Sequence, residues 1–304
     1  MNNNLTYTSE RNAVIPLKTV YSNKGLRGER AREREASRGE ALEASLSRFA
    51  VPSWIIPGGI AENARFAAGR TAEVGLCFFE TEPCLAYGES DLPADLAELP
   101  LSWHVHLPLD LPWSKDEGVA AAKAALALMD KAAFLKAGRA VVHLPEGLGR
   151  SAAPAAVLAW ENFMIHWQNS GRSSRDILLE NQPGDEPQAL LNLAEIYDAG
   201  LCLDFSHWLL TCGPEILPGR DFLQRVALVH LNAPGYEKTG HAALTELVVA
   251  EQAWAAAVLR EFFACRAQDY KTNRQDDIPL MLEIFSWDKI VASLPLLQTW
   301  LAGI

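Results

Sequence analysis

The sequence lacks a long hydrophobic run. No stretch of about 18 uncharged apolar residues occurs, which is the length that a membrane-spanning helix needs. The first residues, MNNNLTYTSERNAV, also lack the basic region and the apolar stretch of a secretory signal. We therefore expect a cytoplasmic protein that has no membrane span.

Cysteine and positive charge are both scarce. The chain has 5 cysteines and no CxxC pair, which excludes a disulfide framework and a cysteine-based zinc knuckle. The 27 Lys and Arg residues are outnumbered by 38 Asp and Glu, for a formal net charge of −11. Binding to nucleic-acid phosphates draws on clustered cations, so we expect a small-molecule substrate and no nucleic-acid partner.

The chain divides into two unequal parts. Residues 24–48, KGLRGERAREREASRGEALEASLSR, mix charges densely and contain few large apolar side chains. Residues 1–48 are therefore expected to form a charged N-terminal segment, either a helical arm or partly disordered. Residues 49–304 are long enough and apolar enough for one catalytic barrel domain.

From residue 49 onward, short apolar runs alternate with longer segments of helical period, which is the pattern of a parallel α/β sheet. Repeated eight times, this unit predicts a (β/α)8 TIM barrel. Strands are expected at 54–56, 74–80, 103–106, 140–143, 177–180, 201–204, 227–230 and 280–283. Helices are expected at about 61–70, 91–99, 118–137, 152–170, 187–199, 208–224, 241–268 and 287–302.

The expected strands end on residues that can bind metal. Seven of the eight runs finish on a carboxylate or an imidazole, namely Glu80, His106, His143, Glu180, Asp204, His230 and Glu283. In a parallel barrel the carboxyl ends of the strands meet at one mouth, where catalytic residues collect. Mixed histidine and carboxylate ligands suit zinc or manganese better than calcium. We therefore expect a site for divalent metal ions.

Other titratable residues near the strand ends allow two interpretations. His104 shares a strand face with His106 and is either a ligand or a partner of one. His207 can turn back to the site, whereas His241, placed at the start of the helix after strand seven, is left open. Glu80 is either a ligand neighbour or an ion-pair member. His166 has helix-surface spacing and is expected to be structural.

The order Glu180-Asn, Asp204-x-x-His207, His230-Leu-Asn and Glu283 resembles the superfamily of xylose isomerase and AP endonuclease IV, from about residue 50 onward. The resemblance implies a xylose isomerase-like barrel in which Glu180, Asp204, His230 and Glu283 hold one ion. In the three-metal branch further histidines are recruited, and the matching positions are His106, His143, His207 and His241. Thr239 stands where that branch has an aspartate, so two ions are expected and a third is left open.

Three further stretches resemble the cobamide-remodelling phosphodiesterases of the CbiR family: Pro57-Gly-Gly-Ile-Ala-Glu-Asn63, His104-Val-His-Leu-Pro-Leu-Asp-Leu-Pro-Trp113 and Glu180-Asn-Gln-Pro183. The resemblance implies hydrolysis of the nucleotide loop of adenosylcobamides, which gives the lower-ligand riboside and adenosylcobinamide phosphate. The corrinoid is then a substrate and not a cofactor. Trp113, Trp208 and Trp287 are expected just beyond strands and could wall a corrin ring or simply pack the loops.

Phosphodiester hydrolysis needs an activated water and neutralisation of the charge that develops on oxygen, and divalent ions supply both. Glu180 is the expected shared ligand, and protonated His207 would stabilise the departing oxygen. The alternatives are a single-metal sugar isomerase or epimerase and a non-catalytic, ligand-binding barrel. A DNA-repair endonuclease is disfavoured by the net charge. The sequence leaves the oligomeric state open.

Overall fold

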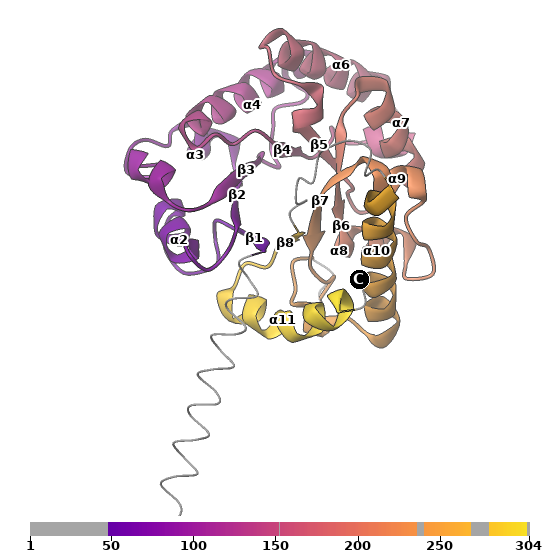
Figure 1. Cartoon of the computed structure of the whole chain (residues 1–304). Coiled ribbons are helices and arrows are strands. Elements are labelled where there is room, and N and C mark those ends of the chain that lie inside the picture. Colours follow the sequence, from indigo (N-terminus) through magenta and orange to yellow (C-terminus); the bar gives the residue numbers. More distant parts are fainter. Residues whose placement is uncertain (1–47, 152, 236–239, 269–279, 303–304) are drawn as a thin grey trace, which may run out of the picture. The chain divides into compact units, whose positions relative to one another are not determined.

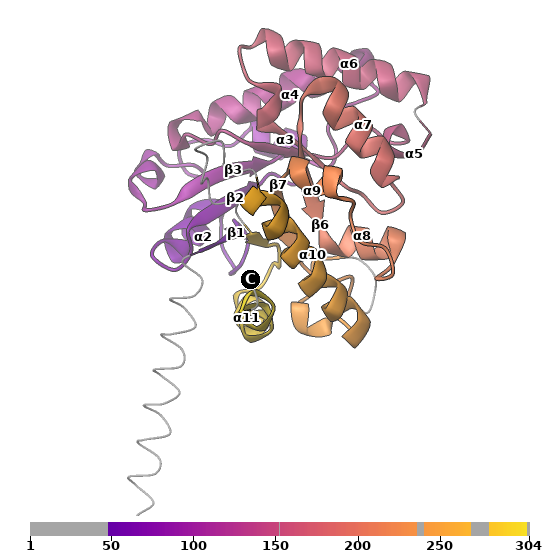
Figure 2. The same cartoon turned by 45° about the vertical axis from the view of Figure 1, so that its right-hand side comes forward.

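The computed structural model describes residues 48–151, 153–235, 240–268 and 280–302. The charged segment expected over residues 1–48 lies outside the described residues except for Arg48. Within the described part, strands stand at the centre and helices surround them (Figures 1 and 2).

The strands form one closed barrel in the order β1 to β8, and every neighbouring pair is parallel. This confirms the expected (β/α)8 architecture. The strands are β1 (Phe49–Pro52), β2 (Glu73–Cys77), β3 (Ser102–His106), β4 (Ala140–Val142), β5 (Ile177–Glu180), β6 (Gly200–Asp204), β7 (Val226–Leu231) and β8 (Leu280–Leu282).

Helices follow the strands and cover the outside of the barrel (Figure 1). The α-helices are α2 (Ile60–Ala67), α3 (Thr81–Leu85), α4 (Val119–Lys131), α5 (Leu148–Ser151), α6 (Pro154–Asn169), α7 (Pro187–Tyr197), α8 (Phe205–Cys212), α9 (Arg220–Arg225), α10 (Val249–Gln268) and α11 (Trp287–Leu301). Short 3-10 turns are η1 (Ala94–Glu98), η2 (Lys115–Gly118), η3 (Ala133–Leu135), η4 (Ser174–Asp176) and η5 (Leu244–Glu246).

The first strand lies earlier than the apolar run Trp54-Ile-Ile that was expected to form it. The backbone N–H groups of Ile55 and Ile56 both donate to Oδ1 of Asn63, which makes this run part of a loop that caps α2. The true strand, β1, ends on Pro52, which has no backbone N–H to donate to a neighbouring strand.

Three expected helices are shorter than their apolar patterns. Only a 3-10 turn over 94–98 forms within 91–99, where Pro93 precedes it. The expected helix 208–224 is two helices, α8 and α9, because Gly213-Pro and Pro218-Gly interrupt it. The long helix after β7 begins at Val249 and not at residue 241.

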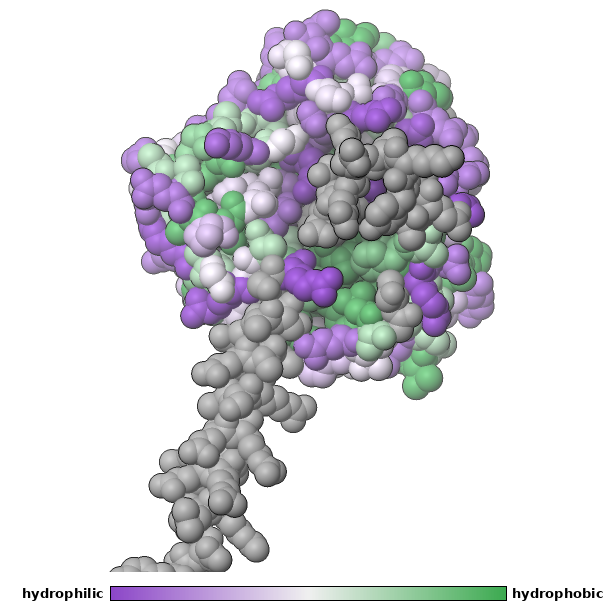
Figure 3. Space-filling view, in the orientation of Figure 1, coloured by the Kyte–Doolittle hydropathy of each residue, from purple (hydrophilic) through white to green (hydrophobic). Residues whose placement is uncertain are grey.

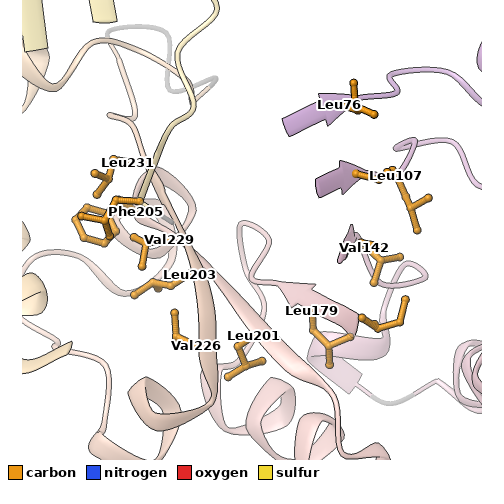
Figure 4. Close-up of a cluster of buried hydrophobic side chains, with 14 of the residues drawn as sticks. Leu76, Leu107, Val142, Leu179, Leu201, Leu203, Phe205, Val226, Val229 and Leu231 are labelled. Atoms are coloured by element: carbon orange, nitrogen blue, oxygen red, sulfur yellow. The ribbon is translucent and has the colours of Figure 1, made fainter. Parts of the chain in front are cut away.

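Side chains along each strand point alternately into the barrel and toward the helices. A small inner layer consists of Ala50, Cys77, Val141, Leu178, Cys202, Leu228 and Met281. The outward residues form the larger core against the helices, and Figure 4 shows part of it, with Leu76, Leu107 and Val142 on one side of the barrel and Leu203, Val229 and Leu231 on the other. These two layers fix which strand residues face the barrel axis.

One register irregularity lies between β6 and β7. Leu201 pairs with Val226 but Cys202 pairs with Leu228, so Ala227 is an extra residue on β7. Beyond this bulge Asp204 lies level with His230. The bulge therefore places two residues of the expected metal site side by side.

The outer surface seen in Figure 3 is largely hydrophilic over the helices, and hydrophobic side chains gather near α11. Among the described residues, no helix combines the length and the apolar character required to cross a bilayer.

Candidate metal centre

Five potential ligands lie two residues beyond members of the inner apolar layer on the same strands. Since side chains alternate along a strand, these residues also face the barrel axis and form the next layer toward the mouth. They are His143, Glu180, Asp204, His230 and Glu283, and His106 joins them from β3. The structure thus brings together six of the seven strand-end residues singled out in the sequence.

Glu180 lies at the centre of this layer and its two oxygen atoms face different partners. Oε2 lies 2.9 Å from Nε2 of His106 and 3.1 Å from Nε2 of His143. Oε1 lies 3.3 Å from Nδ1 of His207 and 3.7 Å from Nδ1 of His230. One buried carboxylate therefore connects two sets of potential ligands.

The two sets overlap at Glu180. His106, His143 and Glu180 place one ligand atom each within 4.8 Å of one another, and so do Glu180, Asp204, His230 and Glu283. In the second set, Nδ1 of His230 lies 3.1 Å from Oε2 of Glu283 and 3.8 Å from Oδ2 of Asp204. Each set has the residue types and spacing for a divalent ion.

Backbone carbonyls fix the tautomers of two histidines. Nδ1 of His106 lies 3.0 Å from the carbonyl oxygen of Leu107, and Nδ1 of His207 lies 3.0 Å from that of Asn181. A carbonyl oxygen can only accept, so each Nδ1 carries the proton and each Nε2 is left for the site. For His106 this Nε2 is the atom that faces Glu180.

Two asparagines hold the second ligand set in place. Asn181 accepts from the backbone N–H of Asp204 and donates to its carbonyl oxygen, at 2.8 and 3.0 Å. Asn232 donates to Oδ2 of Asp204 at 2.6 Å and lies 3.3 Å from Oε2 of Glu283. Both amides follow a ligand closely in sequence, and they tie neighbouring strand ends together.

We expect Asn232→Ala to weaken metal binding by about 10- to 100-fold, as is usual when the partner of a ligand is lost. The side chain is fully buried, and its removal frees Asp204 and Glu283 to rotate. Metal titration of the chelator-treated protein measures the change. Asn162→Ala is the matched control, because that amide donates to the carbonyl oxygen of Glu117 away from the site. Equal affinities for Asn232→Ala and the wild type would contradict the assigned role.

His241 joins the site from a loop and not from a helix. Its Nδ1 lies 3.2 Å from Oε2 of Glu283, and its backbone has a φ of 59°, in the left-handed region. A non-glycine residue in this region is strained, and pairing of Ala233 with Ala242 fixes the adjacent backbone. His241 is therefore near the expected position in space although its secondary structure was predicted wrongly.

Opposite charges in the centre stabilise each other in the metal-free chain. Burial alone would raise the pKa of Glu180, but the neighbouring His143 and His230 outweigh it and hold that pKa well below its ordinary value. Burial opposes protonation of His207, yet Asp204 and Glu180 raise its pKa to about 10. The metal-free centre is thus a cluster of carboxylates and imidazolium groups, and a divalent ion would have to displace protons to bind there.

The residues present fit a divalent ion. Among the described residues, Oε1 of Glu180 and both ring nitrogens of His230 are buried and make no well-aligned hydrogen bond, although Oε1 has Nδ1 of His207 at 3.3 Å and Nδ1 of His230 has Oε2 of Glu283 at 3.1 Å. A buried polar atom without a partner costs about 1–3 kcal/mol, and a cation would satisfy such atoms. The donor set of imidazole and carboxylate suits zinc or manganese.

The metal-free protein should become less stable as pH rises from 6.5 to 9.5. A histidine whose pKa is raised on folding stabilises the fold below its ordinary value of 6.5, and this contribution is lost as the pH approaches about 10, the pKa of His207. The pKa of Glu180 is lowered on folding, so its carboxylate stabilises the fold above pH 4.5, and this contribution is lost as the pH falls into the acid range. Thermal unfolding of chelator-treated protein across this range tests the sign; a Tm that rises toward pH 9.5 would contradict it.

Three of the remaining titratable residues lie outside the ligand sets. His104 is fully buried one layer deeper, where its Nδ1 lies 2.6 Å from Oε1 of Glu73. Glu80 is exposed at the start of α3. His166, on α6, donates from Nδ1 to the carbonyl oxygen of Asn162 at 2.8 Å. His166 therefore has the structural contact expected of it.

The three tryptophans expected at the mouth are placed differently. Trp208 is 2% exposed and packs on Phe222 of α9, which favours the packing alternative over a ligand wall for this residue. The helix α8 begins directly after Asp204, whose side chain caps it, and this turns Trp208 into the core. Trp113 and Trp287 are half-buried; Trp113 packs against Phe163 and Trp287 against Phe66.

Aromatic residues that the sequence interpretation missed lie beside the second ligand set. The ring of Phe285 is 5.0 Å from that of His241, Phe79 is 5.6 Å from Phe285, and Trp54 is 5.8 Å from Phe79. Trp54 and Phe79 had been assigned to strands 54–56 and 74–80, where apolar residues need no further role. Their places just beyond β1 and β2 follow only from the true ends of those strands, so the sequence carried no clear signal for them.

No family model and no curated protein matches the chain. Solved structures do match its fold. A D-tagatose 3-epimerase-like protein has a TM-score of 0.58 at 15% identity, over 84% of this chain and 97% of that one. A xylose isomerase domain protein from Alicyclobacillus acidocaldarius has a TM-score of 0.57 at 14% identity, over 83% and 97%. Endonuclease IV from Thermus thermophilus has a TM-score of 0.55 at 19% identity, over 84% and 98%.

These likenesses establish a xylose isomerase-like (β/α)8 barrel fold for the chain. The matched structures include an epimerase-like protein and an endonuclease by name. Proteins with different chemistries therefore share this fold, and the function has to be inferred from the residues of the site.

Proposed function

We propose that this protein is a metal-dependent hydrolase that cleaves the nucleotide-loop phosphodiester of adenosylcobamides. The products would be the lower-ligand riboside and adenosylcobinamide phosphate. The metal centre supports the class of reaction, and the loop stretches that resemble the cobamide-remodelling phosphodiesterases support the choice of substrate.

The observation that carries the proposal is the position of Glu180 between two ligand sets. Its oxygen Oε2 faces His106 and His143, while Oε1 faces His207 and His230. The two sets would each hold a divalent ion, and paired divalent ions are typical of phosphoester hydrolases, where they activate water and neutralise charge on the phosphoryl oxygens. A centre for one ion would leave His106 and His143 without a role.

The chain's own residues would orient the substrate and supply a proton. His207 holds one proton on Nδ1 against the carbonyl oxygen of Asn181 and keeps Nε2 free. A second proton, carried on Nε2, would be delivered to the departing ribose oxygen. The carboxylates of Asp204 and Glu283 would repel an anionic phosphate, so bound ions would be needed to admit it to the site.

The proposal is tested by incubating metal-loaded protein with adenosylcobamides and resolving the products by chromatography and mass. We expect a riboside and a cobinamide phosphate, with activity abolished by chelator and restored by zinc or manganese. Chelator-treated protein without added metal is the matched control. Absence of both products from protein that is shown to carry two ions would reject the proposal.

A single-ion sugar isomerase or epimerase is the second candidate. It is favoured by one observation, that Glu180, Asp204, His230 and Glu283 already form a complete four-residue ligand set. Paired carboxylates in such a set could also transfer a proton between sugar carbons. A panel of ketoses and aldoses in deuterated water tests it, because isomerisation or epimerisation by proton transfer would introduce deuterium at carbon.

A further inference from the structure

The mouth of the barrel carries an aromatic ledge beside the metal centre. We define the ledge as Trp54, Phe79 and Phe285, which follow β1, β2 and β8. The rings are linked in series, with centroids 5.8 and 5.6 Å apart, and the series ends on the ring of His241. The ledge is therefore continuous with the ligand layer.

The ledge is held rigidly from below. Nε1 of Trp54 donates to the carbonyl oxygen of Cys77 at 3.0 Å, and Trp54 and Phe285 both pack on the inner apolar layer. The backbone N–H of Trp287 donates to the carbonyl oxygen of Ile55 at 2.8 Å, which ties the loop after β8 to the loop after β1. A rigid aromatic surface loses little conformational entropy when it binds a ligand.

Phe79 is the exposed member of the ledge. Its side chain is 41% exposed, although it lies between two aromatic neighbours that could have covered it. The three ledge side chains carry no charge, unlike the layer of carboxylates and histidines beside them. An exposed uncharged ring next to a polar centre favours a planar, conjugated part of the substrate.

From this geometry we infer that the ledge binds the lower-ligand base of the cobamide by stacking and so sets the choice among lower ligands. The inference rests on the proposed function. In a nucleotide loop the ribose joins the phosphodiester to the base, so the base lies one sugar away from the reacting phosphorus. Phe285 contacts the potential ligand His241, and Phe79 lies one ring further from the centre, so the base would rest on Phe79.

The test compares two cobamides, one with a fused two-ring benzimidazole as its lower ligand and one with a single-ring phenolic lower ligand. Phe79→Ala should raise KM for the benzimidazole substrate by about tenfold, the usual order for loss of one stacking ring, and leave kcat within about twofold. KM for the phenolic substrate should rise less, because it offers less surface. Phe79→Tyr keeps the ring and should restore the wild-type KM.

Phe134→Ala is the matched control, since Phe134 is 36% exposed on η3, outside the ledge. Unchanged KM ratios in Phe79→Ala, or equal changes in Phe134→Ala, would overturn the inference while leaving the hydrolase proposal standing. A calorimetric measurement of benzimidazole riboside binding to metal-loaded protein distinguishes failure of the proposed function from failure of the inference about the ledge. If the wild type hydrolyses no cobamide yet binds the riboside at least about fivefold more tightly than Phe79→Ala does, the proposed function fails and the ledge remains a base-binding surface.

Discussion

Glu180→Gln is expected to lower kcat by more than about 100-fold and to reduce the metal content of the protein. Loss of a residue that merely supports a ligand costs about 10- to 100-fold, and Glu180 contacts both ligand sets directly. The amide keeps the shape of the side chain but removes its charge and one acceptor oxygen. The fold should persist, because the remaining contacts of β5 are backbone pairings and apolar packing.

Glu80→Gln is the control for this substitution. Glu80 also follows a strand at the mouth, but it is exposed and lies outside both ligand sets. Turnover by this variant should match the wild type. Full turnover with full metal content in Glu180→Gln would refute the assignment of Glu180 as the shared ligand.

His143→Ala should reduce the bound metal from two ions to one per chain and lower phosphodiesterase activity by about 100-fold. His143 contacts Oε2 of Glu180 and belongs only to the set with His106, so the four-residue set should keep its ion. Metal analysis of the purified variant, combined with its kcat, measures both effects. Its circular dichroism should be unchanged because the side chain is not part of the apolar core.

His166→Ala is the matched control, since His166 lies outside both ligand sets and its Nδ1 donates to the carbonyl oxygen of Asn162 on its own helix. The result also separates the two candidate functions. A single-ion isomerase would carry one ion before and after the His143→Ala substitution and would lose little activity. That outcome would contradict the two-ion proposal and support the second candidate.

The site was largely predictable because a parallel barrel converts sequence position into spatial position. A residue that follows three apolar strand residues, as Glu180 and Glu283 do, must reach the mouth, and alternation decides whether it faces inward. His143, which follows Ala140-Val-Val142, satisfied both conditions, and His106 faces inward although a second histidine, His104, interrupts its strand. Glu80 satisfied only the first, and the structure leaves it exposed outside the ligand layer.

Features of the loops were less predictable because they depend on contacts between distant segments. His241 reaches Glu283 from a left-handed turn that no local pattern signals. Trp208 was expected beyond the strand, but α8 begins at once and buries it. The role of Phe79 depends on Trp54 and Phe285, which come from opposite ends of the chain.

The bulge at Ala227 has a consequence for how such a centre can vary. If β7 paired with β6 without the bulge, Asp204 would lie opposite Val229, which points away from the axis, and its carboxylate would be out of step with His230. The alignment of two ligands at the top of the barrel thus depends on a bulge near its base that absorbs one residue. Loss of Ala227 would remove the bulge and leave Asp204 level with His230, so related barrels could differ by one amino acid there and still keep the same ion spacing.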